Sequence, residues 1–297
     1  MCGIFGAING NRQGNMLLGV FNVERGHDSY GVYTPASTIR GIGRFDDACF
    51  KHTNLRKILG QKVVLGHTRH ATQGHNTIDN AHPFKYGNIL GAHNGIIWND
   101  TDLADKRKCK HRYVVDSEAI FHGLQLEGRK SLIDLEGYAS IWFIDTNIPN
   151  KLFLWSCHNT LWYSTRPNFF AFSSDRKHLE AAYGSKKVTS MQNGELIQVD
   201  IKTCRIELRA NYKCTQTILA KSWQSYRVSD EFGDYAKLYE HSIDDKEETQ
   251  LTKKVPVGYY CDVCAEYIEE PDMPKNFSEK YPQCPFCDKV MYAYEVY

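Results

Sequence analysis

The chain has 297 residues, of which 42% are hydrophobic and 24% charged, a composition typical of globular rather than disordered proteins. No apolar run approaches the ~18–20 residues that a membrane-spanning helix needs, and the first residues lack the pattern of a secretory signal peptide. We therefore expect no membrane segment. Six of the ten cysteines are scattered singly through a chain too large to need disulfides, which favours a reducing cytoplasm.

Charge is distributed unevenly along the chain. Residues 1–226 contain 28 Lys and Arg against 19 Asp and Glu, whereas residues 227–297 contain 8 against 16. The chain is long enough for one large domain and one small domain. The change of sign favours a domain boundary in the region 215–255.

The first two hundred residues alternate short β-rich segments with few helical ones. Strands are predicted where Val, Ile, Phe, Tyr and Trp gather between Gly, Asn, Asp or Pro, and helices where apolar residues recur on one side. In chain order these are a strand at Gly3–Ile8, a helix at Met16–Glu24, strands at Tyr30–Thr34, Lys62–His67 and Ile89–His93, a helix at Ser117–Leu126, strands at Ala139–Asp145, Leu152–Trp155, Leu161–Ser164 and Phe169–Ser173, a helix at Arg176–Tyr183, and a hairpin of Glu195–Asp200 with Arg205–Arg209. Many strands with few helices favour two packed sheets covered by helices.

Cys2 is the most informative single residue. Removal of Met1 is expected, because the aminopeptidases that trim Met require a small second side chain. The α-amine of a processed Cys2 would titrate near pH ~7.7–8.0, so that it could act as a base at neutral pH. Nucleophile and base would then belong to one residue. The alternative is a buried Cys that packs as a small apolar side chain.

Five further segments carry polar residues in a recognisable order. They are Arg25–Gly31, Gly66–Gly74, Asn80–Phe84, Ala92–Asn99 and Asp116–Glu118. Together with Met1–Gly6 they resemble the class II glutamine amidotransferases, above all the glutaminase half of glucosamine-6-phosphate synthase. The resemblance spans residues 2–210. It implies an α+β fold, the four-layer αββα sandwich of the N-terminal-nucleophile hydrolases.

The resemblance assigns the contacts of a glutamine substrate to three residues. Arg69 would hold the α-carboxylate through two parallel hydrogen bonds. Asp116 would take the α-ammonium, and Thr72 would line the same pocket. The structural alternatives are an ion pair for Arg69 and a helix N-cap for Asp116.

Asn94 and Gly95 match the oxyanion hole of the family, where a side-chain amide and a backbone N–H stabilise the tetrahedral intermediate. The alternative is a β-turn, for which Asn-Gly is the strongest short signal. In the implied reaction the Cys2 thiolate attacks the glutamine carboxamide, ammonia leaves, and water releases glutamate from the thioester. No histidine is needed as a base. Arg25, Asp28 and Gly31 are expected to brace the N-terminal strand.

The last part of the chain contains two CxxC pairs separated by 19 residues, Cys261 with Cys264 and Cys284 with Cys287. This spacing predicts a zinc ribbon with four cysteine ligands at residues 255–297, after a linker or surface helical segment at 211–254. Four protein ligands leave no position for water, so the zinc would be structural. A redox dithiol is the alternative for either pair alone.

The predicted zinc ribbon is acidic. Residues 255–297 contain three Lys and no Arg against eight Asp and Glu, which argues against nucleic acid as a partner. We expect a protein-docking or self-association role instead. The residues after 210 are too few for a synthase domain, so the ammonia would go to a separate synthase partner.

Two other functions stay open at this point. The chain could be a stand-alone amidohydrolase that acts on a γ-glutamyl or related amide, or a non-catalytic scaffold. A basic run at Lys106–Arg112 is expected to be a solvated loop at the rim of the site, with a landing patch for an anionic acceptor or an acidic partner as the alternative.

Overall fold

The structure, a computed structural model, describes residues 2–71, 76–109, 114–184 and 187–215 and the backbone of three short strands after residue 257. The chain divides into two compact units, Met1–Tyr226 and Arg227–Tyr297. Among the described residues, none of the helices has the length and apolar character that crossing a membrane requires.

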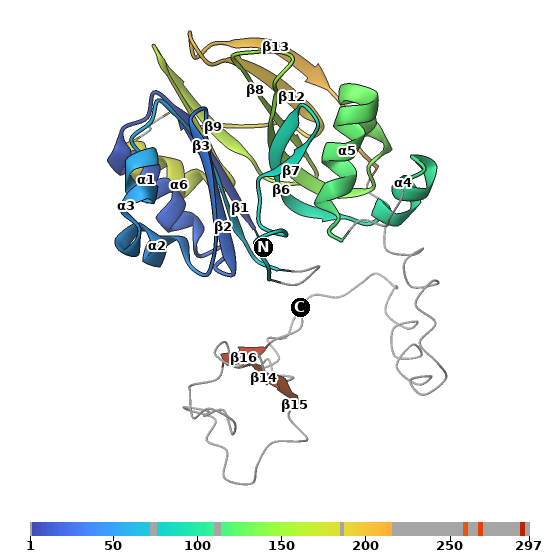
Figure 1. Cartoon of the computed structure of the whole chain (residues 1–297), viewed down its shortest axis with the longest axis horizontal. Coiled ribbons are helices and arrows are strands. Elements are labelled where there is room, and N and C mark those ends of the chain that lie inside the picture. Colours follow the sequence, from blue (N-terminus) through green and yellow to red (C-terminus); the bar gives the residue numbers. More distant parts are fainter. Residues whose placement is uncertain are drawn as a thin grey trace, which may run out of the picture. The chain divides into compact units, whose positions relative to one another are not determined.

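The first unit contains a seven-stranded antiparallel sheet in the order β11-β9-β10-β1-β4-β2-β3. Its strands are β1 (Gly3–Ile8), β2 (Ser29–Thr34), β3 (Ser37–Ile42), β4 (Val63–Arg69), β9 (Trp162–Arg166), β10 (Phe169–Ser173) and β11 (Thr189–Ser190). Helices α1 (Arg12–Asn22), α2 (Phe45–Lys51), α3 (Thr53–Ile58) and α6 (Arg176–Tyr183) lie on its outer side (Figure 1).

A second antiparallel sheet has six strands in the order β13-β12-β8-β7-β6-β5. They are β5 (Phe84–Tyr86), β6 (Ile89–Ile97), β7 (Gly137–Asp145), β8 (Lys151–Cys157), β12 (Glu195–Asp200) and β13 (Ile206–Asn211). Helix α5 (Ser117–Glu127) packs on the outer side of this sheet, between α4 (Asp100–Lys106) and the 3-10 helix η1 (Gly128–Asp134) in the chain.

Successive side chains of a strand point to opposite faces of its sheet, and this alternation produces the four layers. In β1, Ile4 and Ile8 pack between the two sheets together with Trp142 of β7, whereas Phe5 packs on the opposite face among residues of the covering helices. The indole N–H of Trp142 donates to the backbone oxygen of Gly66 over 3.1 Å, which joins the sheets directly. The helix–sheet–sheet–helix order confirms the predicted αββα fold.

Several elements differ from the predicted ones. Helix α1 begins at Arg12 rather than at Met16, because the side chain of Asn11 accepts a 2.7 Å hydrogen bond from the N–H of Gly14 and caps the helix. The strand predicted at Ile89–His93 continues to Ile97. The elements α2, α3, α4, β5 and β11 were not predicted, since each is too short for a clear periodic pattern. The six-residue β3 was not predicted because it is largely exposed and carries few apolar side chains.

The second unit contains β14 (Gly258–Tyr260), β15 (Tyr267–Glu269) and β16 (Tyr292–Tyr294), which form an antiparallel sheet in the order β15-β14-β16. The four cysteines of the predicted zinc site lie outside the described residues. The predicted limits 2–210, 211–254 and 255–297 therefore remain predictions.

Candidate active site

Four of the predicted site residues line one small cavity. Cys2 directly precedes β1, Arg69 ends β4, Gly95 lies in β6, and Asp116 directly precedes α5. The cavity measures about 20 Å³, which is room for about one water molecule. Segments that are distant in the sequence thus meet at the Cys2 thiol.

The Cys2 sulfur lies against the backbone of His70. The N–H of His70 donates to Sγ over 3.3 Å, and Sγ lies 3.4 Å from the oxygen of the same residue. Burial raises the pKa of the Cys2 thiol, and the hydrogen bond from His70 offsets only part of this effect. The thiol is therefore mostly protonated near neutral pH, and a nucleophilic reaction needs a base beside it.

The Arg25–Gly31 segment braces the start of β1. Arg25 Nε donates to the carbonyl oxygen of Cys2 over 3.0 Å. Asp28 Oδ2 accepts the backbone N–H of Ala71 over 2.7 Å, which holds the chain that follows β4. A Cβ on Gly31 would lie 1.8 Å from a backbone oxygen of the segment before β5, so that only glycine fits there. These contacts agree with the supporting role predicted for this motif.

Arg69 and Asp116 bring opposite charges to the cavity. Arg69 is 4% exposed and Asp116 is 8% exposed. Asp116 Oδ2 accepts the backbone N–H of Ile97 over 2.8 Å, and the hydroxyl of Ser117 donates to Oδ1 over 3.4 Å. The side chain makes no capping hydrogen bond to α5, although Asp116 occupies the N-cap position. Its carboxylate thus accepts hydrogen bonds from β6 and from the first side chain of α5, and Asp116 lines the cavity.

The Asn94-Gly95 pair lies inside strand β6, opposite Ser140 and Ala139 of β7. The β-turn interpretation of this pair is therefore wrong. Gly95 has φ +147°, and a Cβ there would lie 2.0 Å from the backbone oxygen of Tyr138. Only glycine adopts this positive φ readily and has no Cβ to clash with the oxygen of Tyr138.

Two residues that the sequence motifs did not indicate position Asn94. Ser174 Oγ accepts the side-chain amide of Asn94 over 3.3 Å and the backbone N–H of Ile4 over 2.9 Å. The amide of Asn159 donates to the carbonyl oxygen of Asn94 over 2.7 Å. Both residues follow strands in segments without a sequence motif, so that only the tertiary contacts reveal them.

Three buried histidines surround the inner side of the cavity. His82 and His93 line it, and the ring of His67 lies tilted by 42° against that of His82 with centroids 4.1 Å apart. Burial lowers the pKa of all three, that of His67 to about 3. They are neutral near pH 7. Both ring nitrogens of His82, and one each of His67 and His93, have no hydrogen-bond partner in the described structure.

Some predicted features are only partly described. Thr72 lies outside the described residues. Of the basic run, the side chain of Arg107 is 2% exposed; it donates to Glu127 over 2.8 Å and to the carbonyl oxygen of Ala119 over 2.7 Å. The prediction of a solvated charged loop is wrong for Arg107, because these acceptors lie on α5. Residues 110–112 lie outside the described residues.

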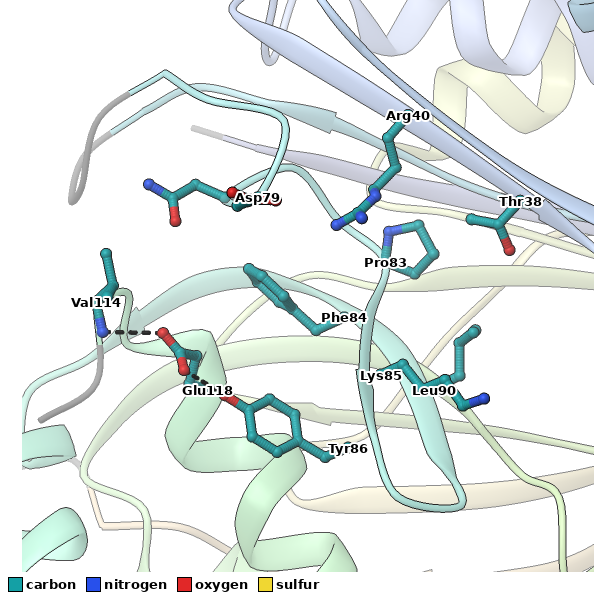
Figure 2. Close-up of a pocket in the computed structure, with 11 residues that line it drawn as sticks. Thr38, Arg40, Asp79, Pro83, Phe84, Lys85, Tyr86, Leu90, Val114 and Glu118 are labelled. Carbon is teal, nitrogen blue, oxygen red and sulfur yellow. Dashed lines mark hydrogen bonds between the residues drawn. The ribbon is translucent and has the colours of Figure 1, made fainter. Parts of the chain in front are cut away.

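A larger cavity of about 550 Å³ is lined in part by the segments that precede β5 and α5, and Figure 2 shows its lining. Arg40, Lys85 and Glu118 contribute charged side chains to it, and Glu118 accepts the backbone N–H of Val114 over 2.9 Å. Cys2 does not line this cavity. The smaller cavity is the candidate active site because it combines a nucleophile with two opposite charges.

The chain is similar in sequence to known enzymes, although no family model matches it. Over 174 residues it is 36% identical to a glutamine--fructose-6-phosphate aminotransferase [isomerizing] of Buchnera aphidicola subsp. Acyrthosiphon pisum (strain APS), with 51% of this chain and 28% of that protein aligned. Over 234 residues it is 30% identical to the enzyme of the same name from Wigglesworthia glossinidia brevipalpis, with 72% and 38% aligned. The chain therefore spans well under half the length of these relatives.

Solved structures show the same fold. The glutamine phosphoribosylpyrophosphate amidotransferase from B. subtilis, in complex with ADP and GMP, superimposes with a TM-score of 0.59 at 17% identity, over 71% of this chain and 49% of that one. A structure described as the allosteric regulatory enzyme of purine biosynthesis gives the same TM-score and coverage at 18% identity. The first unit therefore shares its αββα fold with these two enzymes.

Proposed function

We propose that this chain is a class II glutamine amidotransferase that hydrolyses the side-chain amide of glutamine through Cys2. The observation that supports this most directly is the shared cavity of Cys2, Arg69, Gly95 and Asp116. The similarity to relatives named glutamine--fructose-6-phosphate aminotransferase supports the same substrate class.

The charges in the cavity match the two ends of a free amino acid. A guanidinium such as that of Arg69 can bind the α-carboxylate through two parallel hydrogen bonds. The carboxylate of Asp116 can bind the α-ammonium. Because the cavity holds about 20 Å³, it must widen to admit glutamine. Thr72 is proposed as a further contact in the widened pocket.

The reaction follows from the surroundings of the thiol. After removal of Met1, the α-amine of Cys2 takes the thiol proton, and Sγ attacks the carboxamide carbon of glutamine. The backbone N–H of Gly95 and the side-chain amide of Asn94 stabilise the oxyanion. The amine returns its proton to the departing ammonia, and a water molecule then hydrolyses the thioester to glutamate.

A direct assay tests the proposal. Mass spectrometry first verifies that the purified protein begins at Cys2, and glutamate and ammonia are then measured after addition of glutamine. We expect equal amounts of both products, and none with Cys2→Ala. Equal rates for the two proteins would contradict a role for Cys2. Faster hydrolysis of γ-glutamyl amides than of glutamine would instead identify a stand-alone amidohydrolase. If neither substrate is hydrolysed, with or without candidate partners, the chain is a non-catalytic scaffold.

We further propose that the ammonia is delivered to a synthase on a separate polypeptide. The relatives are named aminotransferases, which is consistent with an acceptor that consumes the released nitrogen. Glutamine hydrolysis should then accelerate when the synthase and its acceptor are added. A rate that no candidate synthase changes would count against this delivery.

For the C-terminal unit we propose a structural zinc ion bound by Cys261, Cys264, Cys284 and Cys287. The spacing of the two CxxC pairs supports it, as does the three-stranded sheet whose central strand β14 ends directly before Cys261. Elemental analysis should find this zinc, and replacing the four cysteines by serine should remove it. The acidic composition favours a protein over a nucleic acid as the partner of this unit.

A further inference from the structure

A second group of metal-binding side chains lies in the first unit, apart from the Cys2 cavity. Cys157 is the last residue of β8, His158 follows it, and Cys214 lies after β13. One donor atom from each, two sulfurs and a ring nitrogen, lie within 4.8 Å of one another. Both cysteines are free thiols in the structure. A sequence separation of 57 residues conceals the group from motif searches.

The backbone holds the two sulfurs in place. The N–H of Cys214 donates to Sγ of Cys157 over 3.1 Å, a type of hydrogen bond that stabilises metal-bound thiolates. Cys157 is fully buried and Cys214 is 3% exposed, within the apolar cluster between the second sheet and α5. Packing as small apolar side chains would explain this burial. It does not explain why an imidazole lies beside both sulfurs.

The ring of His158 is oriented from both sides. Its backbone N–H donates to Oδ1 of Asn193 over 2.9 Å, which fixes the residue at the end of the strand. One ring nitrogen lies 3.3 Å from the carbonyl oxygen of Cys214 and the other 3.3 Å from the side-chain nitrogen of Asn193. With Nε2 protonated and donating to the carbonyl oxygen of Cys214, Nδ1 can exchange its contact with Asn193 for a metal ion, so that the metal-bound ring keeps a second-shell partner.

We propose that Cys157, His158 and Cys214 bind one zinc ion. Two thiolates and a neutral imidazole form a donor set that zinc prefers, and they leave a fourth position for water or another ligand. The two thiolates also cancel the charge of Zn²⁺, so that the occupied site carries no net charge among apolar neighbours. The two thiol protons are released to solvent on binding.

Little movement is needed to close the three donors around an ion. Zinc bonds of about 2.0–2.3 Å bring tetrahedral donor atoms to about 3.3–3.8 Å from one another. Small side-chain rotations achieve this from the present spacing. The ion would fasten the segment after β13 to the end of β8, close to the bridge between Thr215 and Glu136.

The test uses the full-length chain in which the four tail cysteines, Cys261, Cys264, Cys284 and Cys287, are replaced by serine. Elemental analysis after purification with zinc should find about one zinc per chain. Adding Cys157→Ser and Cys214→Ser together should reduce this to nearly none. Cys49→Ser is the matched control, because Cys49 is equally buried at 3% exposure and lies apart from the group; it should leave the zinc content unchanged.

A second measurement covers the case in which the double variant fails to fold. In the same tail-substituted chain, Co²⁺ added in place of zinc should give thiolate-to-metal charge-transfer absorption and tetrahedral d–d bands. His158→Asn keeps both thiols, and it should shift the d–d bands and weaken Co²⁺ binding at least tenfold. Zinc content and spectra that do not respond to these changes would overturn the proposal. So would a Cys157–Cys214 disulfide, seen as a mass 2 Da lower under non-reducing conditions that disappears on reduction and is absent from the variant with Cys157→Ser and Cys214→Ser.

Discussion

The side-chain amide of Asn94 donates to the hydroxyl of Ser174 over 3.3 Å. The same hydroxyl accepts the backbone N–H of Ile4, two residues beyond Cys2, over 2.9 Å. One serine therefore ties strand β6 to strand β1. The distance between the proposed oxyanion donor and the Cys2 thiol depends on this link.

Asn94→Ala should lower kcat for glutamine hydrolysis by about 10²–10³ and leave KM nearly unchanged. The reason is that loss of one oxyanion donor affects the transition state and not the bound substrate. Steady-state measurement of glutamate tests this. Asn147→Ala, at an exposed turn, is the control and should behave as wild type. A rise in KM with constant kcat would instead assign Asn94 to substrate binding.

Ser174→Ala should lower kcat by about tenfold, less than Asn94→Ala, because the amide remains present but loses its orientation. The same substitution leaves the buried N–H of Ile4 without its acceptor, which should cost about 1–3 kcal/mol in the free energy of unfolding. Urea unfolding measures the second effect. A kcat equal to that of wild type would show that Asn94 is positioned by its other contacts, such as that with Asn159.

Asp116→Asn should raise KM for glutamine by about 10–100-fold. The amide oxygen can still accept the N–H of Ile97, so the local structure is kept while the charge that binds the α-ammonium is lost. Asp102→Asn, on an exposed face of α4, is the matched control. Unchanged KM for Asp116→Asn would remove Asp116 from the proposed glutamine site.

The pH profile of kcat/KM should rise through the pKa of the Cys2 α-amine, near ~8, because only the neutral amine can take the thiol proton. No inflection is expected near pH ~6.5, where ordinary histidines titrate. The reason is that burial lowers the pKa values of all three histidines that line the cavity, His70, His82 and His93. An inflection near ~6.5 would identify a histidine as the base instead.

The free energy of unfolding should fall as the pH decreases below ~6.5. The unfolded chain then binds protons on His67, His82 and His93, whereas the folded protein does not, since burial lowers their pKa values, that of His67 to about 3. The contribution of His67 is complete above pH ~6.5 and is lost as the pH falls toward 3, at up to ~1.4 kcal/mol per pH unit.

Urea unfolding at pH 7.5 and 5.5, followed by the fluorescence of the buried Trp142 and Trp155, measures this loss. His67→Gln should reduce the difference between the two pH values, because one titrating group is removed. His52→Gln, at an exposed position, should leave it unchanged. The same pH dependence in both variants would show that His67 does not contribute.

The sequence motifs predicted the layers of the fold and several residues of one cavity. The reason is that the alternation of apolar and polar residues in strands, and the polar motifs, can each be recognised within a short segment. The contacts that each of these side chains makes in the folded protein could not be predicted in this way. Asn-Gly is a turn signal in isolation, yet the pairing of Asn94 and Gly95 with β7 keeps them in a strand. Arg107 belongs to a charged run, yet acceptors on α5 bury its side chain.

By itself, the sequence determined the nucleophile candidate at Cys2, the order of the motifs and the two CxxC pairs in the acidic C-terminal region, since each is a local pattern. Only the tertiary structure decided which residues orient Asn94, and it alone brought Cys157, His158 and Cys214 together. The reason is physical. Sheet pairing and packing bring distant segments within hydrogen-bonding and metal-binding distance, and that distance depends on the whole fold rather than on any one segment.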